Sequence, residues 1–236
     1  MKTVTIVIPV FNEGATVDTL LSRVTGQRIP GMNKEIIVVD DGSVDDSISN
    51  IKYKISNIEN RTKASIQLIT LQQNQGKGYA LRQAFKVATG DIILIQDADL
   101  EYNPSDYDKL LEPFTNPKVD IVYGSRFLGS HLSTMYLYAL GNKFVTWVTN
   151  ILFHTNITDM ETGYKAFRRT VLDHLELRAK RFDFEPEFTA KALKAGFQIY
   201  EVPISYFQRN FSEGKKLTWR DGVRALGVLI RIRFFR

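Results

Sequence analysis

Three acidic side chains, Asp97, Asp99 and Glu101, follow directly after the apolar run at residues 92–95. A continuous aliphatic run of this kind is typical of a parallel strand that is buried on both faces, and ligands bind beyond the carboxyl ends of such strands. Extended backbone would turn the three carboxylates to one side. Because like charges at this spacing repel one another unless a cation lies among them, the pattern predicts a Mg²⁺ or Mn²⁺ site. The alternative is a solvated acidic turn that leads into a helix near Asn103.

Two earlier apolar runs, residues 4–8 and 36–39, also end in polar turns. These turns contain Pro9, Phe11, Asn12 and Glu13 after the first run, and Asp40, Asp41, Gly42 and Ser43 after the second. Each turn precedes a stretch of helical character, and we expect a further strand at residues 66–71 and a helix at residues 76–88. This alternation indicates an α/β fold with a mainly parallel sheet flanked by helices. Three polar turns are therefore predicted to meet at one edge of the sheet.

The composition limits the chemistry. The 236 residues are 44% hydrophobic and 24% charged, as in a globular protein with a substantial core. The absence of cysteine excludes disulfides, zinc thiolate sites and a cysteine nucleophile. The scattered His131, His154 and His174 favour ordinary surface or packing roles over a metal site. No signal-type segment precedes the first strand, which is expected to begin at Thr3, so we expect a cytoplasmic location.

Positive charge is concentrated at the C-terminal end. Residues 207–236 contain eight basic and two acidic residues, a net charge of +6, although the whole chain carries only +5. Aliphatic and aromatic residues lie between the cations, which predicts an amphipathic helical segment suited to an anionic membrane surface. A terminal helix that packs on its own domain with a solvated cationic face is the alternative. Nucleic acid is not expected as a partner, because no nucleic-acid-binding module is present.

A second apolar stretch, residues 132–153, is rich in aromatic side chains and contains a single lysine. Its uncharged part is short for a membrane span, so we interpret it as a buried or interfacial helix. Core packing is the commoner reason for such aromatics. The alternative is that this stretch and the basic C-terminal segment together form an apolar groove that binds an isoprenoid chain.

Seven short motifs together are more specific than any one of them. They are Ile8-Pro9-Val10-Phe11-Asn12-Glu13, Val38-Val39-Asp40-Asp41-Gly42-Ser43, Asn74-Gln75-Gly76-Lys77-Gly78, Asp97-Ala98-Asp99, Gly124-Ser125-Arg126, Asp159-Met160-Glu161-Thr162-Gly163-Tyr164, and the cations Arg209, Lys215 and Lys216. In this order and spacing they resemble the inverting glycosyltransferases of family 2. These have a GT-A fold with a Rossmann-like sheet, and the nearest resemblance is to the dolichyl and polyprenyl phosphate mannose and glucose synthases.

The resemblance implies a role for each motif. Nucleotide-sugar binding is implied for Pro9, Phe11, Asn12, Glu13, Asp40, Asp41, Lys77, Asp97, Ala98, Thr162 and Gly163. Catalytic roles are implied for Asp97, Asp99, Arg126 and Asp159. Asp99 and Glu101 would hold Mg²⁺ or Mn²⁺. Helix capping is the alternative for Glu13 and Asp40, and a plain helix start is the alternative for residues 74–78.

The same resemblance implies a single domain over residues 1–236. Residues 1–125 would form the nucleotide-sugar-binding half, residues 126–206 the acceptor half, and residues 207–236 the basic amphipathic tail. Related enzymes place an acceptor-side carboxylate near Glu185 and Glu187. The alternative for both is the acidic first turn of a helix expected at residues 186–195, where the helix dipole favours negative charge.

The basic residues of the motifs indicate which acceptor the enzyme would use. A monoester phosphate, with a second pKa of about 6, is already largely ionised at neutral pH and needs cations rather than a general base. Arg126, Arg209 and Lys215 fit that role by resemblance, and Lys216 is a further candidate. The family's usual serine before the lysine is Gly214 in this sequence.

We therefore expect metal-dependent, inverting transfer of a hexose from a nucleotide sugar to a polyprenyl or dolichyl phosphate at the cytoplasmic membrane face. Mannose is the favoured hexose, which makes GDP-mannose the favoured donor, and another membrane protein would translocate the product. One alternative is transfer to a sugar hydroxyl in glycan assembly, but the Gln-x-x-Arg-Trp signature of polysaccharide synthases is absent. A non-catalytic nucleotide-sugar-binding scaffold is a second alternative. A nucleotidyltransferase is disfavoured, since residues 9–14 lack a glycine- and arginine-rich loop.

Overall fold

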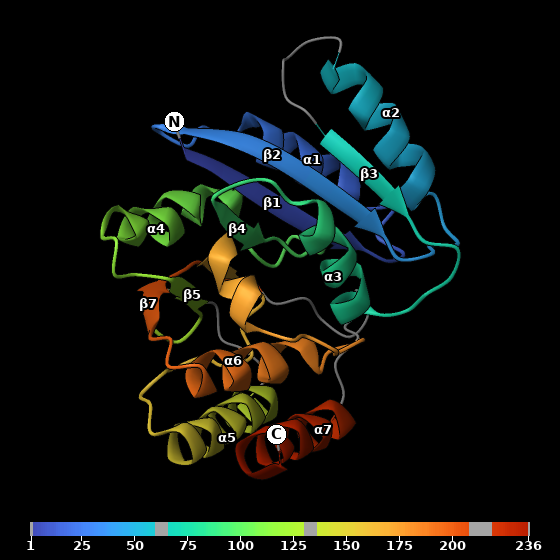
Figure 1. Ribbon diagram of the computed structural model, residues 1–236. Coiled ribbons are helices and arrows are strands. Elements are labelled where there is room, and N and C mark those ends of the chain that lie inside the picture. Colours follow the sequence, from blue (N-terminus) through green and yellow to red (C-terminus); the bar gives the residue numbers. More distant parts are fainter. Residues whose placement is uncertain (1, 60–65, 130–135, 208–218, 236) are drawn as a thin grey trace.

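The computed structural model describes residues 2–59, 66–129, 136–207 and 219–235. Its centre is a seven-stranded sheet in the order β3-β2-β1-β4-β6-β5-β7 (Figure 1). The strands are β1 (Lys2–Val10), β2 (Met32–Asp40), β3 (Ile66–Thr70), β4 (Ile92–Ile95), β5 (Ile121–Ser125), β6 (Lys165–Arg168) and β7 (Ile199–Pro203). All neighbouring strands are parallel except β6, which is antiparallel to both β4 and β5. The predicted mainly parallel α/β sheet is confirmed.

Helices cover both faces of the sheet. The α-helices are α1 (Val17–Gly26), α2 (Ser47–Glu59), α3 (Lys77–Val87), α4 (Tyr107–Leu111), α5 (Tyr136–Phe153), α6 (Phe184–Lys194) and α7 (Trp219–Phe235), and the 3₁₀ helices are η1 (Pro104–Asp106), η2 (Glu112–Thr115) and η3 (Arg169–His174). One face packs against α1, α2 and α4, and the other packs against α3, η3 and α6.

The central strands form because they are buried on both sides. In β1, Ile6 and Ile8 enter the core on the α1 side, while Val7 enters the core on the α3 side. β2 alternates in the same way, and all four residues of β4 are buried. This explains the continuous aliphatic runs, since neither face of these strands meets water. The sheet therefore holds the carboxyl ends of β1, β2 and β4 rigidly side by side.

A third layer lies outside α6. Helices α5 and α7 pack against each other and against α6, and they bury Val145, Ala225, Leu229 and Ile232 (Figure 1). The C-terminal helix thus packs on α5 and α6. This agrees with the alternative interpretation of the sequence, in which a terminal helix packs on its own domain. Within the described residues, no helix is both long enough and apolar enough to cross a membrane.

Candidate functional site

The polar turns after β1 and β2 are joined by hydrogen bonds. The backbone N–H of Asn12 donates to Ser43 Oγ (2.9 Å), and Asn12 Oδ1 accepts from the N–H of Val44 (2.9 Å). The N–H of Glu13 donates to Ser47 Oγ (2.8 Å), which ties the first turn to the start of α2. The two turns therefore meet at one edge of the sheet, as predicted.

Asp41 organises a third segment at this edge. Its carboxylate accepts hydrogen bonds from the backbone N–H groups of Gln75 (2.8 Å) and Gly76 (2.7 Å) and from Asn74 Nδ2 (3.0 Å). Burial raises the pKa of Asp41, although the two backbone donors oppose that shift. Gly76 has a φ of +98°, and a Cβ atom there would overlap the carbonyl oxygen of Lys180. Asp41 and Gly76 thus have a structural role in shaping the segment at residues 74–78.

Asp40 differs from its neighbour. It is fully buried at the end of β2, and its Oδ2 accepts from the N–H of Ser43 (3.2 Å). Its Oδ1 is buried and has no hydrogen-bond donor among the described residues. An unpaired buried acceptor costs free energy until a donor from outside the protein supplies the missing hydrogen bond.

Lys77 lies between two carboxylates from distant parts of the chain. Its Nζ is 2.7 Å from Asp97 Oδ1 and 2.8 Å from Glu185 Oε1. Burial alone would lower the pKa of Lys77, but the two carboxylates raise that pKa overall and keep the ammonium charged. A Cβ atom at Gly163 would overlap the Asp97 carboxylate, so the segment at residues 159–164 lies directly against this cluster.

Arg126 and Asp159 form a bidentate ion pair. Arg126 Nε and Nη2 each lie 2.7 Å from the Asp159 carboxylate, which is fully buried, and the Arg126 N–H also donates to it (3.0 Å). Glu201 holds the turn that carries Asp159 in place, because its carboxylate accepts hydrogen bonds from the N–H groups of Thr158 (2.7 Å) and Asp159 (3.0 Å). Thr162 is held by its hydroxyl, which donates to the Gly124 carbonyl (2.7 Å).

The expected extended arrangement of the three carboxylates after β4 is wrong. β4 ends at Ile95, and the backbone turns at Ala98 and Asp99. Asp99 Oδ1 accepts from the N–H of Glu101 (3.1 Å), while Glu101 Oε2 accepts from the hydroxyl of Tyr206 (2.6 Å). Asp97 is directed instead to Lys77. The extended pattern failed because the sheet ends before these residues, so period-two alternation no longer applies to them.

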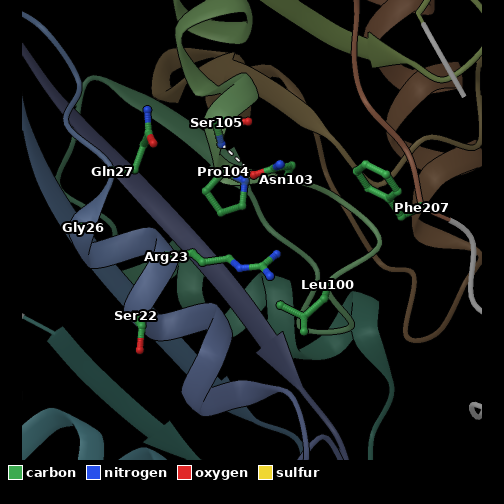
Figure 2. A pocket seen from close by; sticks show the side chains of 9 residues that line it. All are labelled: Ser22, Arg23, Gly26, Gln27, Leu100, Asn103, Pro104, Ser105 and Phe207. Atoms are coloured by element: carbon green, nitrogen blue, oxygen red, sulfur yellow. Dashed lines mark hydrogen bonds between the residues drawn. The ribbon is translucent and has the colours of Figure 1, made fainter.

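A pocket of about 750 Å³ lies beside this turn (Figure 2). It is lined by Ser22, Arg23, Gly26, Gln27, Leu100, Asn103, Pro104, Ser105 and Phe207. Figure 2 shows the Arg23 side chain extending from α1 toward the segment that carries Leu100 and Pro104. The N–H of Phe207 donates to the Glu101 carbonyl (3.0 Å), which connects one wall of the pocket to the turn after β4.

The sequence profile of Glycosyl transferase family 2 matches residues 5–176, which include six of the seven motifs but not the cations Arg209, Lys215 and Lys216. The chain belongs to glycosyltransferase family 2. The family resemblance inferred from the motifs is therefore confirmed, and the protein is a glycosyltransferase.

Two relatives of this glycosyltransferase are named for lipid phosphates. It is 30% identical to a dolichol-phosphate mannosyltransferase of Pyrococcus furiosus over 90% of its own length and 58% of the relative's. It is 24% identical to a dodecaprenyl-phosphate galacturonate synthase of Rhizobium johnstonii over 97% of its length and 67% of the relative's. The chain thus spans little more than half of the first of these relatives.

Solved structures show the same fold. A glucosyl-3-phosphoglycerate synthase of Mycobacterium tuberculosis, crystallised with Mn²⁺, UDP and phosphoglyceric acid, superposes with a TM-score of 0.75 at 19% identity. The match covers 100% of this chain and 80% of that one. A second structure of that enzyme, with Mg²⁺ and UDP, gives a TM-score of 0.73 at 18% identity over 98% and 79% of the two chains. The glycosyltransferase has the GT-A fold, as expected.

The residues at the turn after β4 are compatible with a metal. Within the part of the chain that the structure describes, no cluster of three or more His, Asp or Glu side chains is placed to hold an ion. Mg²⁺ in nucleotide sites takes one or two carboxylates and completes its shell with substrate phosphates and water. Asp99 and Glu101 supply two such hard oxygen donors, so this pair suits a metal that arrives with a diphosphate.

Two charged residues of the site, Glu161 and Lys165, were not assigned a role from the sequence. They interact with Glu185 and with the Arg126–Asp159 pair. The alternation of Lys165 with Phe167 along β6 could have revealed Lys165, because it places a lysine on the buried face of a strand. Glu161 lies within the motif at residues 159–164, which could have drawn attention to it.

The two glutamates that open α6 have separate roles. Glu187 accepts from the N–H groups of Arg178 (2.9 Å) and Ala179 (2.6 Å), so its role is structural. Glu185 joins the site through Lys77. The predicted acceptor cations Arg209, Lys215 and Lys216 lie outside the described residues.

Proposed function

We propose that this family 2 glycosyltransferase transfers a hexose, with inversion, from a nucleotide sugar to a polyprenyl phosphate at a membrane surface. The observation that carries the proposal is the meeting of three features at one sheet edge. These are the unpaired buried Oδ1 of Asp40, the Lys77–Asp97 pair and the Arg126–Asp159 pair. The names of the two lipid-phosphate relatives support the choice of acceptor.

The donor would lie along the turns after β1, β2 and β4. Asp40 offers a carboxylate oxygen to a base N–H or a ribose hydroxyl, and Glu13 is a second buried carboxylate close by. Pro9 and Phe11, both partly buried, would pack on the flat base. Asn12 and Asp41 hold this surface in place through their hydrogen bonds, and Lys77 orients Asp97 toward the sugar.

The reaction needs an ionised nucleophile and stabilisation of the diphosphate that leaves. A phosphate acceptor is already ionised at neutral pH, so no general base is required. Arg126 stays charged beside Asp159, because that carboxylate raises its pKa against the lowering effect of burial. Arg126 would therefore orient the acceptor phosphate for attack opposite the leaving group. A Mg²⁺ or Mn²⁺ ion at Asp99 and Glu101 would supply positive charge to offset the charge that grows on the diphosphate.

Exposed apolar side chains on α5 and α7 support the membrane location. On α5, Leu140, Phe144, Trp147 and Ile151 recur at helical spacing, and each is at least half exposed. On α7, Val223, Ile230, Phe234 and Phe235 are also exposed. Cations such as Arg224 and Arg231 accompany them, which suits the interface of an anionic bilayer.

The test of the reaction uses the full chain with Mn²⁺ or Mg²⁺, a panel of radiolabelled nucleotide sugars and a short polyprenyl phosphate. Metal-dependent passage of label from one donor into the organic phase would support the proposal and would name the sugar. We expect GDP-mannose to be that donor. Hydrolysis without lipid product would favour a hydroxyl acceptor instead, and donor binding without turnover would favour the scaffold.

The test of the membrane surface is flotation with vesicles that contain anionic lipid. The double variant Phe144→Ser and Trp147→Ser should float about ten-fold less than the wild type, because it removes two large exposed apolar side chains. Tyr53→Ser is the matched control, since Tyr53 is 69% exposed on α2, far along the chain from α5. Equal flotation of all three proteins would contradict the membrane location.

A further inference from the structure

Glu161 combines a buried acceptor with a charged environment that the roles above leave unexplained. Its Oε1 is shielded from solvent and has no hydrogen-bond donor among the described residues. The segment that carries it is held firmly, because Lys165 Nζ donates to the carbonyls of Met160 (2.9 Å) and Thr162 (2.6 Å) on either side. The backbone on either side of Glu161 is therefore held in place.

The groups that face Glu161 come from several elements. Glu185 lies on α6, Lys165 on β6, Arg126 directly after β5, and Asp159 on the same turn. Two of these groups are anionic and two are cationic. Glu161 consequently interacts with Glu185 of the Lys77–Asp97–Glu185 cluster and with both members of the Arg126–Asp159 pair.

We infer that Glu161 binds a hydroxyl group of the hexose that is transferred. This inference rests on the proposed function, in which the sugar must lie between Asp97 on the donor side and Arg126 on the acceptor side. Gly163, only two residues further on, lies against the Asp97 carboxylate. Glu161 interacts with Arg126 and Asp159 on the acceptor side and retains an unpaired oxygen.

The chemistry of the position favours a hydroxyl over an anion or a cation. A phosphate would be repelled by the carboxylates of Glu185 and Asp159. A metal ion would be repelled by the cationic Lys165 and Arg126. A hydroxyl carries no charge, can donate to Oε1 and can accept from a protonated carboxyl group.

The protonation state of Glu161 gives the inference a second readout. Burial and then the nearby Glu185 raise its pKa to about 8, against the lowering effects of Lys165 and Arg126. Glu161 is therefore mostly protonated at neutral pH and ionises in the range in which sugar binding can be measured. Binding of the hexose should change with pH between 7 and 9, whereas binding of the nucleotide alone should not follow Glu161.

The experiment compares the affinity of the full chain for a nucleotide sugar with its affinity for the matching nucleoside diphosphate. Calorimetric titrations with GDP-mannose and GDP, and with UDP-glucose and UDP, are made in the presence of Mn²⁺. The variants are Glu161→Gln, which keeps the shape of the side chain, and Glu161→Ala. Glu112→Gln is the matched control, because Glu112 is exposed on η2.

We expect Glu161→Ala to weaken binding of the nucleotide sugar by about ten-fold, as for loss of one hydrogen bond, and to leave binding of the diphosphate within about two-fold. The ratio of the two affinities should vary with pH in the wild type and be flat in Glu161→Gln. A nucleotide sugar that lacks the contacted hydroxyl should bind the wild type and Glu161→Gln equally.

Parallel loss of both ligands would overturn the inference, since a merely structural role predicts it. Unchanged affinity for the nucleotide sugar would also overturn it while leaving the proposed function intact. If the wild type bound no nucleotide sugar, the proposed function would fail and the inference with it. Because Glu161→Gln preserves volume, the comparison remains decisive even if Glu161→Ala does not fold.

Discussion

The two edges of the sheet hold carboxylates in different ways. At the amino-terminal edge, Glu35 accepts on both oxygens, from Thr89 Oγ1 (2.8 Å) and Thr89 N–H (2.9 Å), and from Thr5 Oγ1 and Gly90 N–H. At the carboxyl edge, Asp40 and Glu161 each keep one buried oxygen that has no donor among the described residues. The pKa of Glu35 is lowered, since its hydrogen bonds outweigh the effect of burial, whereas the pKa of Glu161 is raised.

The difference between the two edges lies in whether each carboxylate has all its hydrogen-bond partners within the protein. A carboxylate that is fully hydrogen-bonded within the protein stabilises the fold and has nothing left to offer a ligand. One that is buried and incompletely bonded costs stability and is retained where binding restores the missing partner. The carboxyl edge also carries the ion pairs of Lys77 and Arg126, so the costs are concentrated where the reaction is proposed to occur.

The largest effect is expected at Asp99. Asp99→Ala should reduce sugar transfer by about 1,000-fold or more, because the metal that stabilises the leaving diphosphate would lose a ligand. Asp108→Ala, which changes an exposed aspartate on α4, should leave the rate unchanged. Both proteins should melt within a few degrees of the wild type. Substantial sugar transfer by Asp99→Ala would show that Asp99 is not required as a metal ligand.

Removing the central cation should affect stability strongly. Lys77→Ala leaves Asp97 and Glu185 facing each other without a counter-ion, and we expect a loss of about 3 kcal/mol in the free energy of unfolding. Lys54→Ala breaks an ion pair with the half-exposed Asp18 and should cost less than about 1 kcal/mol. Urea unfolding at pH 7 measures both. Equal losses of unfolding free energy in the two variants would mean that the Lys77 ion pairs contribute no more to stability than an exposed ion pair.

The pH dependence of stability should distinguish Glu161 directly. Its folded pKa of about 8 lies above its ordinary value of 4.5, so the folded state binds more protons between these values. Stability from this group is complete below pH 4.5 and is lost as the pH rises through 8. Relative to the wild type, Glu161→Gln should gain melting temperature between pH 5.5 and 8. A constant difference over this range would show that Glu161 does not titrate there.

A smaller effect of opposite sign is expected at Glu35. Glu35→Gln places an amide against N–H donors and should cost about 1 kcal/mol at pH 7, with sugar transfer unchanged. Because the folded pKa lies below the ordinary 4.5, the contribution is present above pH 4.5 and is lost as the pH falls through the folded value. Urea unfolding at pH 7 and pH 3 should show the difference shrinking at the lower pH. A ten-fold loss of sugar transfer in Glu35→Gln would instead show that Glu35 contributes to the reaction.

Much of the fold could be predicted because it rests on local patterns. The aliphatic runs at β1, β2 and β4 predict buried strands, and the glycines and polar residues that follow them predict the turns. The expected strand at residues 66–71 and helix at residues 76–88 agree with β3 and α3 to within one residue at each end. The ordered motifs also indicated the family, since their spacing is a property of the chain alone.

The partners of each side chain depended on elements far apart in sequence. Lys77 meets Glu185 across more than one hundred residues, and only the packing of α6 beside α3 brings the two together. The turn at Ala98 likewise redirected Asp97 and Asp99 away from a shared face, because sheet pairing ends at Ile95. The sequence by itself determined the strands, their polar ends and the family. The tertiary structure decided which carboxylates are paired and which, like Glu161, remain available, because burial and counter-charges arise only when distant segments pack.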